Sequence, residues 1–286
     1  MLGDKARGGE PVGGDSSGGD SGAGKSGGGN SSADWDAFDP AAYSALNYAT
    51  LRADDAQLLS RAAEFFAAAD IAEDAHGLDV GPGSNLYPAL TLLPFCRSVT
   101  MWEYSTSNAA WLRAQVQSYD PMWDAYWAVL ARNPAHARIR DPRAALAERA
   151  AVAQGSLFAM PRRLWDVGTM FFVAESMTTR FTEFEAAVGR FVDALRPGAP
   201  FAAAFVENSE GYDVGSRRFP AVRVGVEEVR AVLADRTAAL TVDRVGLVDV
   251  PWREGYTGMV FATGRAGAGA CDSASACARQ SGSSRA

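Results

Sequence analysis

The segment GLDVGPGSNLY, residues 77–87, constrains the fold of this 286-residue chain more than any other. A short apolar run is followed by two glycines, Gly81 and Gly83, and then by a helix-like stretch that carries an aromatic residue. This order is typical of a buried strand, a tight turn and a helix. Glycine has no β-carbon, so the backbone of such a turn can approach a ligand closely. The segment predicts either a ligand-binding turn or, as the simpler alternative, a tight turn and nothing more.

Strand-like and helix-like stretches alternate around this turn. Such alternation predicts a mostly parallel sheet covered by helices, and two closing strands with no helix between them predict antiparallel pairing at one edge. We therefore expect a Rossmann-like α/β sandwich with helical additions before its first strand. The expected strands are 77–80, 96–104, 164–176, 199–208, 240–250 and 255–265, and the expected helices are 34–51, 54–71, 84–93, 106–119, 121–130, 141–154, 181–195 and 224–236.

The two ends of the chain differ in composition from its middle. Residues 1–33 and 265–286 are rich in Gly and Ser and have few apolar side chains to bury, so we predict disordered tails on either side of a domain at 34–264. Residues 19–26, GDSGAGKS, fit the phosphate-loop pattern, but no strand or helix can form beside them, and we treat the match as chance. Cys271 and Cys277 also lie in a tail.

Charge and composition exclude several classes of protein. A net charge of −7 disfavours nucleic acid as a partner, because proteins that bind it usually present a basic stripe. We find neither a signal peptide nor a membrane-spanning stretch, so no membrane partner and a cytoplasmic protein are expected. His76 and His136 stand alone and the cysteines match no zinc spacing, so we expect no metal site.

The residues around the glycine turn bear on which cofactor it holds. Glu103 lies 22 residues after Gly81, at the end of the second expected strand, where it can accept hydrogen bonds from ribose hydroxyls. A dinucleotide site usually has a third glycine where this chain has Leu86, and Pro82 lacks an amide hydrogen that a pyrophosphate would use. These features favour S-adenosylmethionine (SAM), which has an adenosine and no phosphate, over NAD.

Several motifs in order resemble one known family. LDVGPGSNLYPAL, WEYSTSNAAWL, WDVGTMFFVAES and EGYDVG, with AFDPAAYSALNY near the front, are similar to the nicotinamide, phenylethanolamine and thioether N- or S-methyltransferases over about residues 35–263. The resemblance implies a class I SAM-dependent methyltransferase: a mostly parallel seven-stranded sheet with an antiparallel edge strand, and a helical cap at 34–75. It also implies a small-molecule acceptor, and we expect methylation at an amine nitrogen by a monomeric enzyme.

The resemblance assigns roles to individual residues. Tyr43 and Tyr48 would lie in the cap over the methionine moiety and the acceptor, with Tyr43 also in the catalytic site. Ser156 falls where the family often has an acid beside the adenine. The implied cofactor-binding residues are Tyr43, Tyr48, Gly81, Gly83, Ser84, Tyr87, Glu103, Tyr104, Asn108 and Ser156.

The acceptor side is less closely matched to the family. Glu254, in WREGYTG, falls where the family has an acid in its final strand pair, and a carboxylate can orient or deprotonate an amine. The resemblance therefore makes Glu254 the expected amine contact and second catalytic residue, and the alternative is an exposed glutamate of a hairpin. Phe205 and Ala221 stand at the family's polar acceptor positions, which disfavours nicotinamide as substrate, and Tyr212 would either close the pocket or pack locally. Two alternatives remain open: an NAD-linked oxidoreductase and a non-catalytic SAM-binding protein.

Overall fold

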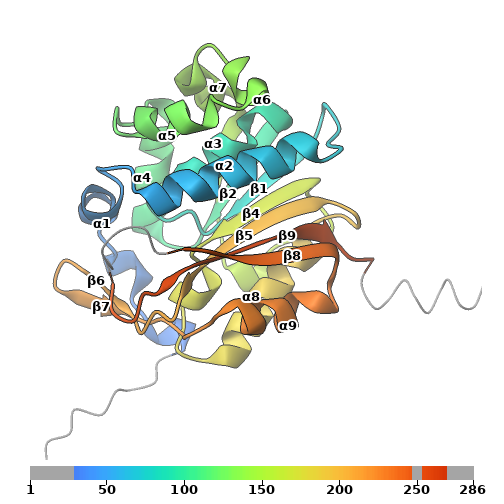
Figure 1. Ribbon diagram of the computed structural model, residues 1–286. Coiled ribbons are helices and arrows are strands. Elements are labelled where there is room, and N and C mark those ends of the chain that lie inside the picture. Colours follow the sequence, from blue (N-terminus) through green and yellow to red (C-terminus); the bar gives the residue numbers. More distant parts are fainter. Residues whose placement is uncertain (1–28, 247–252, 269–286) are drawn as a thin grey trace, which may run out of the picture.

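The computed structural model describes residues 29–246 and 253–268. One seven-stranded sheet, in the order β3-β2-β1-β4-β5-β9-β8, forms the centre of the molecule (Figure 1). The first five strands are parallel, whereas β9 pairs antiparallel with both β5 and the edge strand β8. The strands are β1 (His76–Val80), β2 (Ser98–Glu103), β3 (Ala150–Gln154), β4 (Val167–Phe171), β5 (Pro200–Glu207), β8 (Thr237–Val245) and β9 (Gly258–Ala266).

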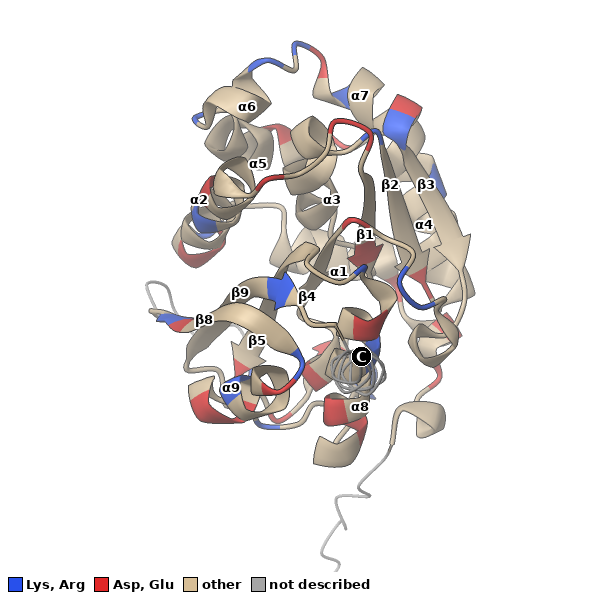
Figure 2. Cartoon of the chain, turned by 90° about the vertical axis from the view of Figure 1, so that its right-hand side faces the viewer, with Lys and Arg blue, Asp and Glu red and all other residues tan. Residues whose placement is uncertain are grey.

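Helices cover both faces of this sheet. In Figure 1, α2, α3 and α5 lie above the strands and α8 and α9 below them. Acidic and basic residues are interspersed along the helices in the view of Figure 2. No helix among the described residues is both long and apolar enough to cross a membrane. The α-helices are α1 (Pro40–Asn47), α2 (Ala53–Ala68), α3 (Tyr87–Leu92), α4 (Thr106–Gln117), α5 (Trp123–Leu130), α6 (Pro134–Ala137), α7 (Pro142–Arg149), α8 (Phe181–Ala194) and α9 (Val226–Ala234).

Strand β5 shows how the sequence fills both layers. Every residue of the strand is buried. Phe201 and Phe205 point into the cluster formed with α8 and α9, whereas Ala202 and Val206 alternate into the cluster formed with α2, α3 and α5. Successive side chains of a strand face opposite sides, so a strand covered on both faces reads as a continuous apolar run. APFAAAFVE is such a run, and the prediction of a strand there is confirmed.

The prediction of one helix at 141–154 is confirmed for its first part and wrong for its last five residues. Its first part is α7, with Asp141 as the N-cap accepting from the Ala144 amide at 3.0 Å, but residues 150–154 form strand β3. Alanine-rich AAVAQ has strong helix propensity and no apolar alternation. Pairing with residues 99–103 of β2 overrides that propensity, and the five residues complete the seven-stranded sheet at its other edge.

The ordered elements extend slightly beyond the predicted domain. Short 3-10 helices, η1 (Asn30–Ser32) and η2 (Trp35–Ala37), precede α1, and β9 continues to Ala266. The predicted tails otherwise lie outside the described residues, as do Cys271 and Cys277. Residues 212–219, for which no element was predicted, form a hairpin of β6 (Tyr212–Val214) and β7 (Arg217–Phe219).

Candidate active site

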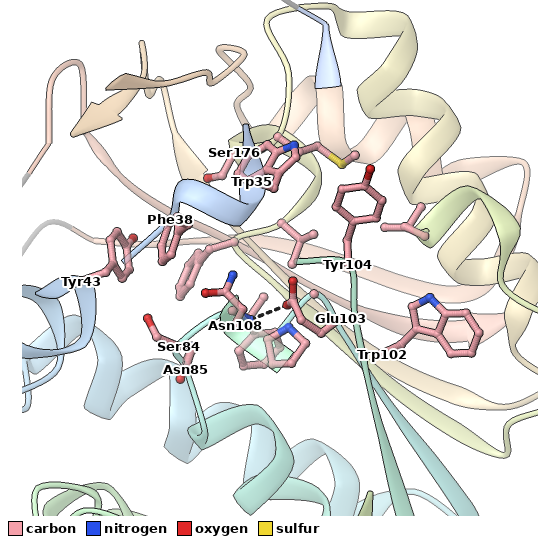
Figure 3. A pocket seen from close by; sticks show the side chains of 18 of the residues that line it. Trp35, Phe38, Tyr43, Ser84, Asn85, Trp102, Glu103, Tyr104, Asn108 and Ser176 are labelled. Carbon is pink, nitrogen blue, oxygen red and sulfur yellow. Dashed lines mark hydrogen bonds between the residues drawn. The ribbon is translucent and has the colours of Figure 1, made fainter. Parts of the chain in front are cut away.

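A pocket lies at the carboxyl ends of the parallel strands, where the strand order reverses between β1 and β4. Such reversal points are the usual ligand sites of open α/β sheets. The pocket holds roughly 910 Å³, counting the part open to solvent. Its walls come from the segments after β1, β2, β3 and β4 and from the N-terminal cap, η2 and α1 (Figure 3).

The glycine turn forms the base of the pocket. Gly81 and Gly83 have φ angles of +59° and +58°, a region that residues with a β-carbon rarely adopt. A β-carbon on Gly81 would lie 2.6 Å from Val173 Cγ1, whereas one on Gly83 would meet nothing closer than 3.9 Å. The turn is fixed by two backbone hydrogen bonds, from the Gly81 amide to the Trp102 carbonyl and from the Asn85 amide to the Pro82 carbonyl, both 2.8 Å. The sequence therefore needs glycine at 81 for two separate reasons.

Glu103 lines the pocket beside this turn. One carboxylate oxygen accepts from the Gly83 amide at 2.9 Å and the other from the Ser105 amide at 2.8 Å. Burial raises the pKa of Glu103, and these two hydrogen bonds together with one from the Asn108 side chain act in the opposite direction. The side chain is thus held by backbone donors on both oxygens, with lone pairs left for a ligand in the pocket.

Aromatic side chains of the cap close the pocket from the other side. The rings of Tyr43, in α1, and Tyr48, which directly follows α1, have their centroids 6.1 Å apart, and Phe38 packs 5.1 Å from Tyr43. The cap is anchored to α4 by the Thr106 amide, which donates to Asp36 at 2.7 Å, and by the Ser107 hydroxyl, which donates to the Phe38 carbonyl at 3.0 Å. These contacts bring residues from the front of the chain over the ends of the strands.

Buried polar atoms provide a test of whether SAM fits these residues. Among the described residues, Ser84 Oγ, Asn85 Nδ2 and Asn108 Oδ1 are buried in the pocket wall without a hydrogen-bond partner. Buried polar atoms in native proteins normally have partners. The amino and carboxylate groups of a methionine moiety would supply them, and Glu103 would take ribose hydroxyls. The donors and acceptors present therefore fit SAM.

A model of the NNMT/PNMT/TEMT family matches residues 30–250 of the sequence, which is well over half of it. The chain belongs to that family. As a member of the NNMT/PNMT/TEMT family it has the fold of a SAM-dependent methyltransferase, and its cofactor is SAM. No curated protein matches the sequence.

Three solved structures are similar to the structure of this chain. The [4+2]-cyclase SpnF is 15% identical with a TM-score of 0.48, covering 75% of this chain and 82% of its own. A SAM-dependent methyltransferase from Methanosarcina mazei is 15% identical with a TM-score of 0.46, covering 69% and 95%. The 1,6-didemethyltoxoflavin-N1-methyltransferase of Burkholderia thailandensis is 16% identical with a TM-score of 0.45, covering 74% and 80%. The family assignment rests on the family model and not on these three.

Most residues implied by the family resemblance lie together in this pocket. Tyr104 is 56% exposed at its mouth, and the Ser156 hydroxyl caps η4 (Leu157–Ala159) by accepting from the Phe158 amide at 3.3 Å. The implied residues that line the pocket are Tyr43, Tyr48, Gly81, Gly83, Ser84, Glu103, Tyr104, Asn108 and Ser156.

Tyr87 and Glu254 lie outside the pocket lining of this family member. Tyr87 is fully buried at the start of α3, where its hydroxyl donates to Asp55 at 3.0 Å and its ring stacks on Tyr126. Glu254 is exposed and pairs with Arg218 at 2.5 Å. The preceding residue, Arg253, lines the pocket.

Of the other residues considered for the acceptor side, some line the pocket and others do not. Phe205 points to the far face of the sheet and packs 5.6 Å from Phe184. Tyr212 lines the pocket, and its hydroxyl donates to the Ser176 carbonyl at 3.2 Å. Phe171 and Phe172 also line it. Arg253 was not predicted from the sequence, where the expectation of a carboxylate favoured Glu254 in the same WREGYTG segment.

Proposed function

We propose that this protein transfers the methyl group of SAM to a nitrogen atom of a small-molecule acceptor by in-line displacement. One observation carries the proposal: a single pocket joins the glycine turn and Glu103 to an aromatic chamber beneath the cap. A cofactor site and an acceptor site must share one cavity for direct transfer, because the two reacting atoms have to meet within about 3 to 3.5 Å.

In this proposal the residues near β1 and β2 hold the cofactor. Gly81 and Gly83 admit it close to the backbone, Ser84 and Asn108 bind its methionine part, and Glu103 accepts from its ribose. Tyr104 and Ser156 lie beside the adenosine, and Tyr43 and Tyr48 cover the methionine part and the acceptor. Tyr87 supports the site from behind through its hydrogen bond to Asp55. Because Glu254 is exposed and ion-paired, the acceptor contact is assigned to pocket residues instead.

The chemistry requires positioning more than acid-base catalysis. SAM supplies an electrophilic methyl group with a good leaving group. Burial raises the pKa of Tyr43, Tyr48 and Tyr212, so these hydroxyls stay protonated and act as hydrogen-bond partners. Their rings exclude water from the reacting atoms and present faces that favour a cation by about 0.5 to 2 kcal/mol. Because protonated tyrosines cannot take a proton from the acceptor, the pocket suits an acceptor whose nitrogen is already uncharged when it binds.

Titration calorimetry with SAM, S-adenosylhomocysteine (SAH) and NAD tests the cofactor and separates the alternatives. We expect micromolar or tighter binding of SAM and SAH and none of NAD. Release of SAH in the presence of a panel of nitrogen acceptors then tests transfer. Binding of SAM with no SAH formed from any acceptor in a cell extract would favour the non-catalytic alternative, and binding of NAD but not SAM would exclude methyl transfer.

Replacing Ser156 with aspartate should strengthen SAM binding by about 0.5 to 1.5 kcal/mol. A carboxylate at the mouth of the adenine side can accept from the exocyclic amine, and hydrogen bonds to charged groups exceed those between neutral ones. Aspartate also caps a helix as well as serine does, so η4 should persist. Ser156→Asn, which is neutral and of similar size, is the control. If Ser156→Asp and Ser156→Asn bind SAM with equal affinity in calorimetry, Ser156 does not lie beside the adenine.

A further inference from the structure

Arg253 introduces a positive charge into the pocket. Its side chain lines the pocket, yet the residue is only 9% exposed. Among the described residues that line the pocket, Glu103 and Arg253 are the ones with charged side chains. Glu103 lies beside the glycine turn after β1, whereas Arg253 contacts Ser176 after β4 and Ser209 after β5, so the two charges are held by different segments of the chain.

The contacts of Arg253 place it on the acceptor side. One terminal nitrogen donates to the Tyr43 hydroxyl at 2.9 Å, and the other to the hydroxyls of Ser176 at 3.1 Å and Ser209 at 3.5 Å. The guanidinium carbon lies 4.5 Å from the centroid of the Tyr212 ring. Ser176 follows β4 and Ser209 follows β5, whereas Gly81, Gly83 and Ser84 follow β1 and Glu103 ends β2. Tyr43, proposed to cover both the methionine part and the acceptor, is the contact that Arg253 shares with the proposed cofactor site.

These contacts also fix the direction of the guanidinium. A ring face beneath it and hydroxyls at both terminal nitrogens hold the plane in one orientation, and arginine in such a fork matches the two oxygens of a carboxylate. Behind Ser176 lies Glu175, whose Oε1 accepts from the Ser176 hydroxyl at 3.0 Å. Burial raises the pKa of Glu175 to about 7, so its charge at neutral pH is partial. The acceptor end therefore presents a fixed cation with a weaker anion behind it.

We propose that Arg253 binds a carboxylate of the methyl acceptor, so that the acceptor is an uncharged nitrogen nucleophile that carries a carboxylate. This inference rests on the proposed methyl transfer and specifies its substrate class. A protonated amine would meet both the guanidinium and the sulfonium of SAM, and like charges brought together in a site are unfavourable. An acceptor with a carboxylate would offset that positive charge. The carboxylate of SAM itself is the competing ligand of the same chemistry.

Matched acceptor pairs test the proposal on the wild-type protein. Anthranilate with aniline, and imidazole-4-acetate with 4-methylimidazole, share a nitrogen and differ by a carboxylate. Binding of each is measured by calorimetry with SAH saturating, and methyl transfer by SAH release with SAM. We expect the acid member of at least one pair to bind about ten to a hundred times more tightly than its partner. If no acid member binds better than its partner, including the case in which none binds, the proposal is wrong.

Variants then show whether Arg253 causes the preference. Arg253→Met should abolish it and Arg253→Lys retain part of it, whereas Arg138→Met, at an exposed arginine that follows α6, should leave it unchanged. Thermal unfolding checks that each variant is folded. An acid preference that survives in Arg253→Met would overturn the assignment, and because the wild-type comparison needs no variant, an unfolded Arg253→Met leaves the test intact.

A second pair of ligands separates acceptor from cofactor. SAH has an amino-acid carboxylate, and 5′-methylthioadenosine lacks it. If Arg253→Met weakens SAH binding and leaves that of 5′-methylthioadenosine unchanged, Arg253 belongs to the cofactor and the acceptor assignment is wrong. Unchanged affinity for both supports the acceptor. Failure of wild-type protein to bind SAH would instead refute the proposed methyl transfer, which distinguishes the two failures.

Discussion

Replacement of Gly81 with alanine is expected to lower the free energy of unfolding by about 2 to 5 kcal/mol. A residue with a β-carbon at positive φ costs about 1 to 2 kcal/mol, and forcing extra volume into a packed site costs about 1 to 3 kcal/mol. Both penalties apply at Gly81, where φ is +59° and the new carbon would lie 2.6 Å from Val173 Cγ1. Denaturant unfolding measures the change, and SAM affinity should fall with it because the turn forms the base of the pocket.

Gly83 is a matched control for this experiment. Its φ of +58° is almost the same, but an added β-carbon would have no neighbour closer than 3.9 Å. Gly83→Ala should therefore cost only the conformational part, about 1 to 2 kcal/mol. In a Val173→Ala background, Gly81→Ala should cost only the conformational part, because the packing part is the coupling between the two substitutions. Equal losses for Gly81→Ala and Gly83→Ala would show that the contact with Val173 does not contribute.

The fold was largely predictable because most elements carry a local signal that agrees with their final place. The apolar run of β5 and the Asp-Pro start of α7 are examples. Strand β3 was not predictable in this way. AAVAQ is partly exposed at the edge of the sheet, where a strand needs little apolar character, and its conformation is set by pairing with β2, far away in sequence.

The candidate site was predictable where function depends on the backbone and less so where it depends on side-chain direction. The glycine turn and Glu103 are fixed by strand ends, and the parallel sheet brings those ends together. Glu254 and Arg253 are adjacent, yet one is exposed and the other is buried in the pocket. Which of two neighbouring residues points inward follows from tertiary packing, here the stacking of Arg253 on Tyr212, and no periodicity in the sequence records it.

Loss of the Glu103 carboxylate is expected to weaken SAM binding by about 1 to 3 kcal/mol, or roughly 5- to 160-fold, in Glu103→Ala. The ribose hydroxyls would lose their acceptor in a buried position. Glutamine should be nearly as poor a substitute as alanine. Both oxygens of Glu103 accept from backbone amides, of Gly83 and Ser105, so the amide group of glutamine would place a donor against one of them. Glu185→Gln, at an exposed position of α8, controls for the loss of a charge.

The pH dependence of binding gives an independent measure of the same contact. Burial raises the pKa of Glu103 above its ordinary value, and ribose hydroxyls that donate to the carboxylate favour its ionised form. SAM affinity should therefore be full above the pKa of Glu103 in the ligand-free protein and fall as the pH drops through it. In Glu103→Gln this fall in affinity at low pH, the acid limb of the profile, should disappear, because the side chain no longer titrates. Calorimetry across the acid range with both proteins measures it, and an acid limb that persists in Glu103→Gln would mean that another group controls binding.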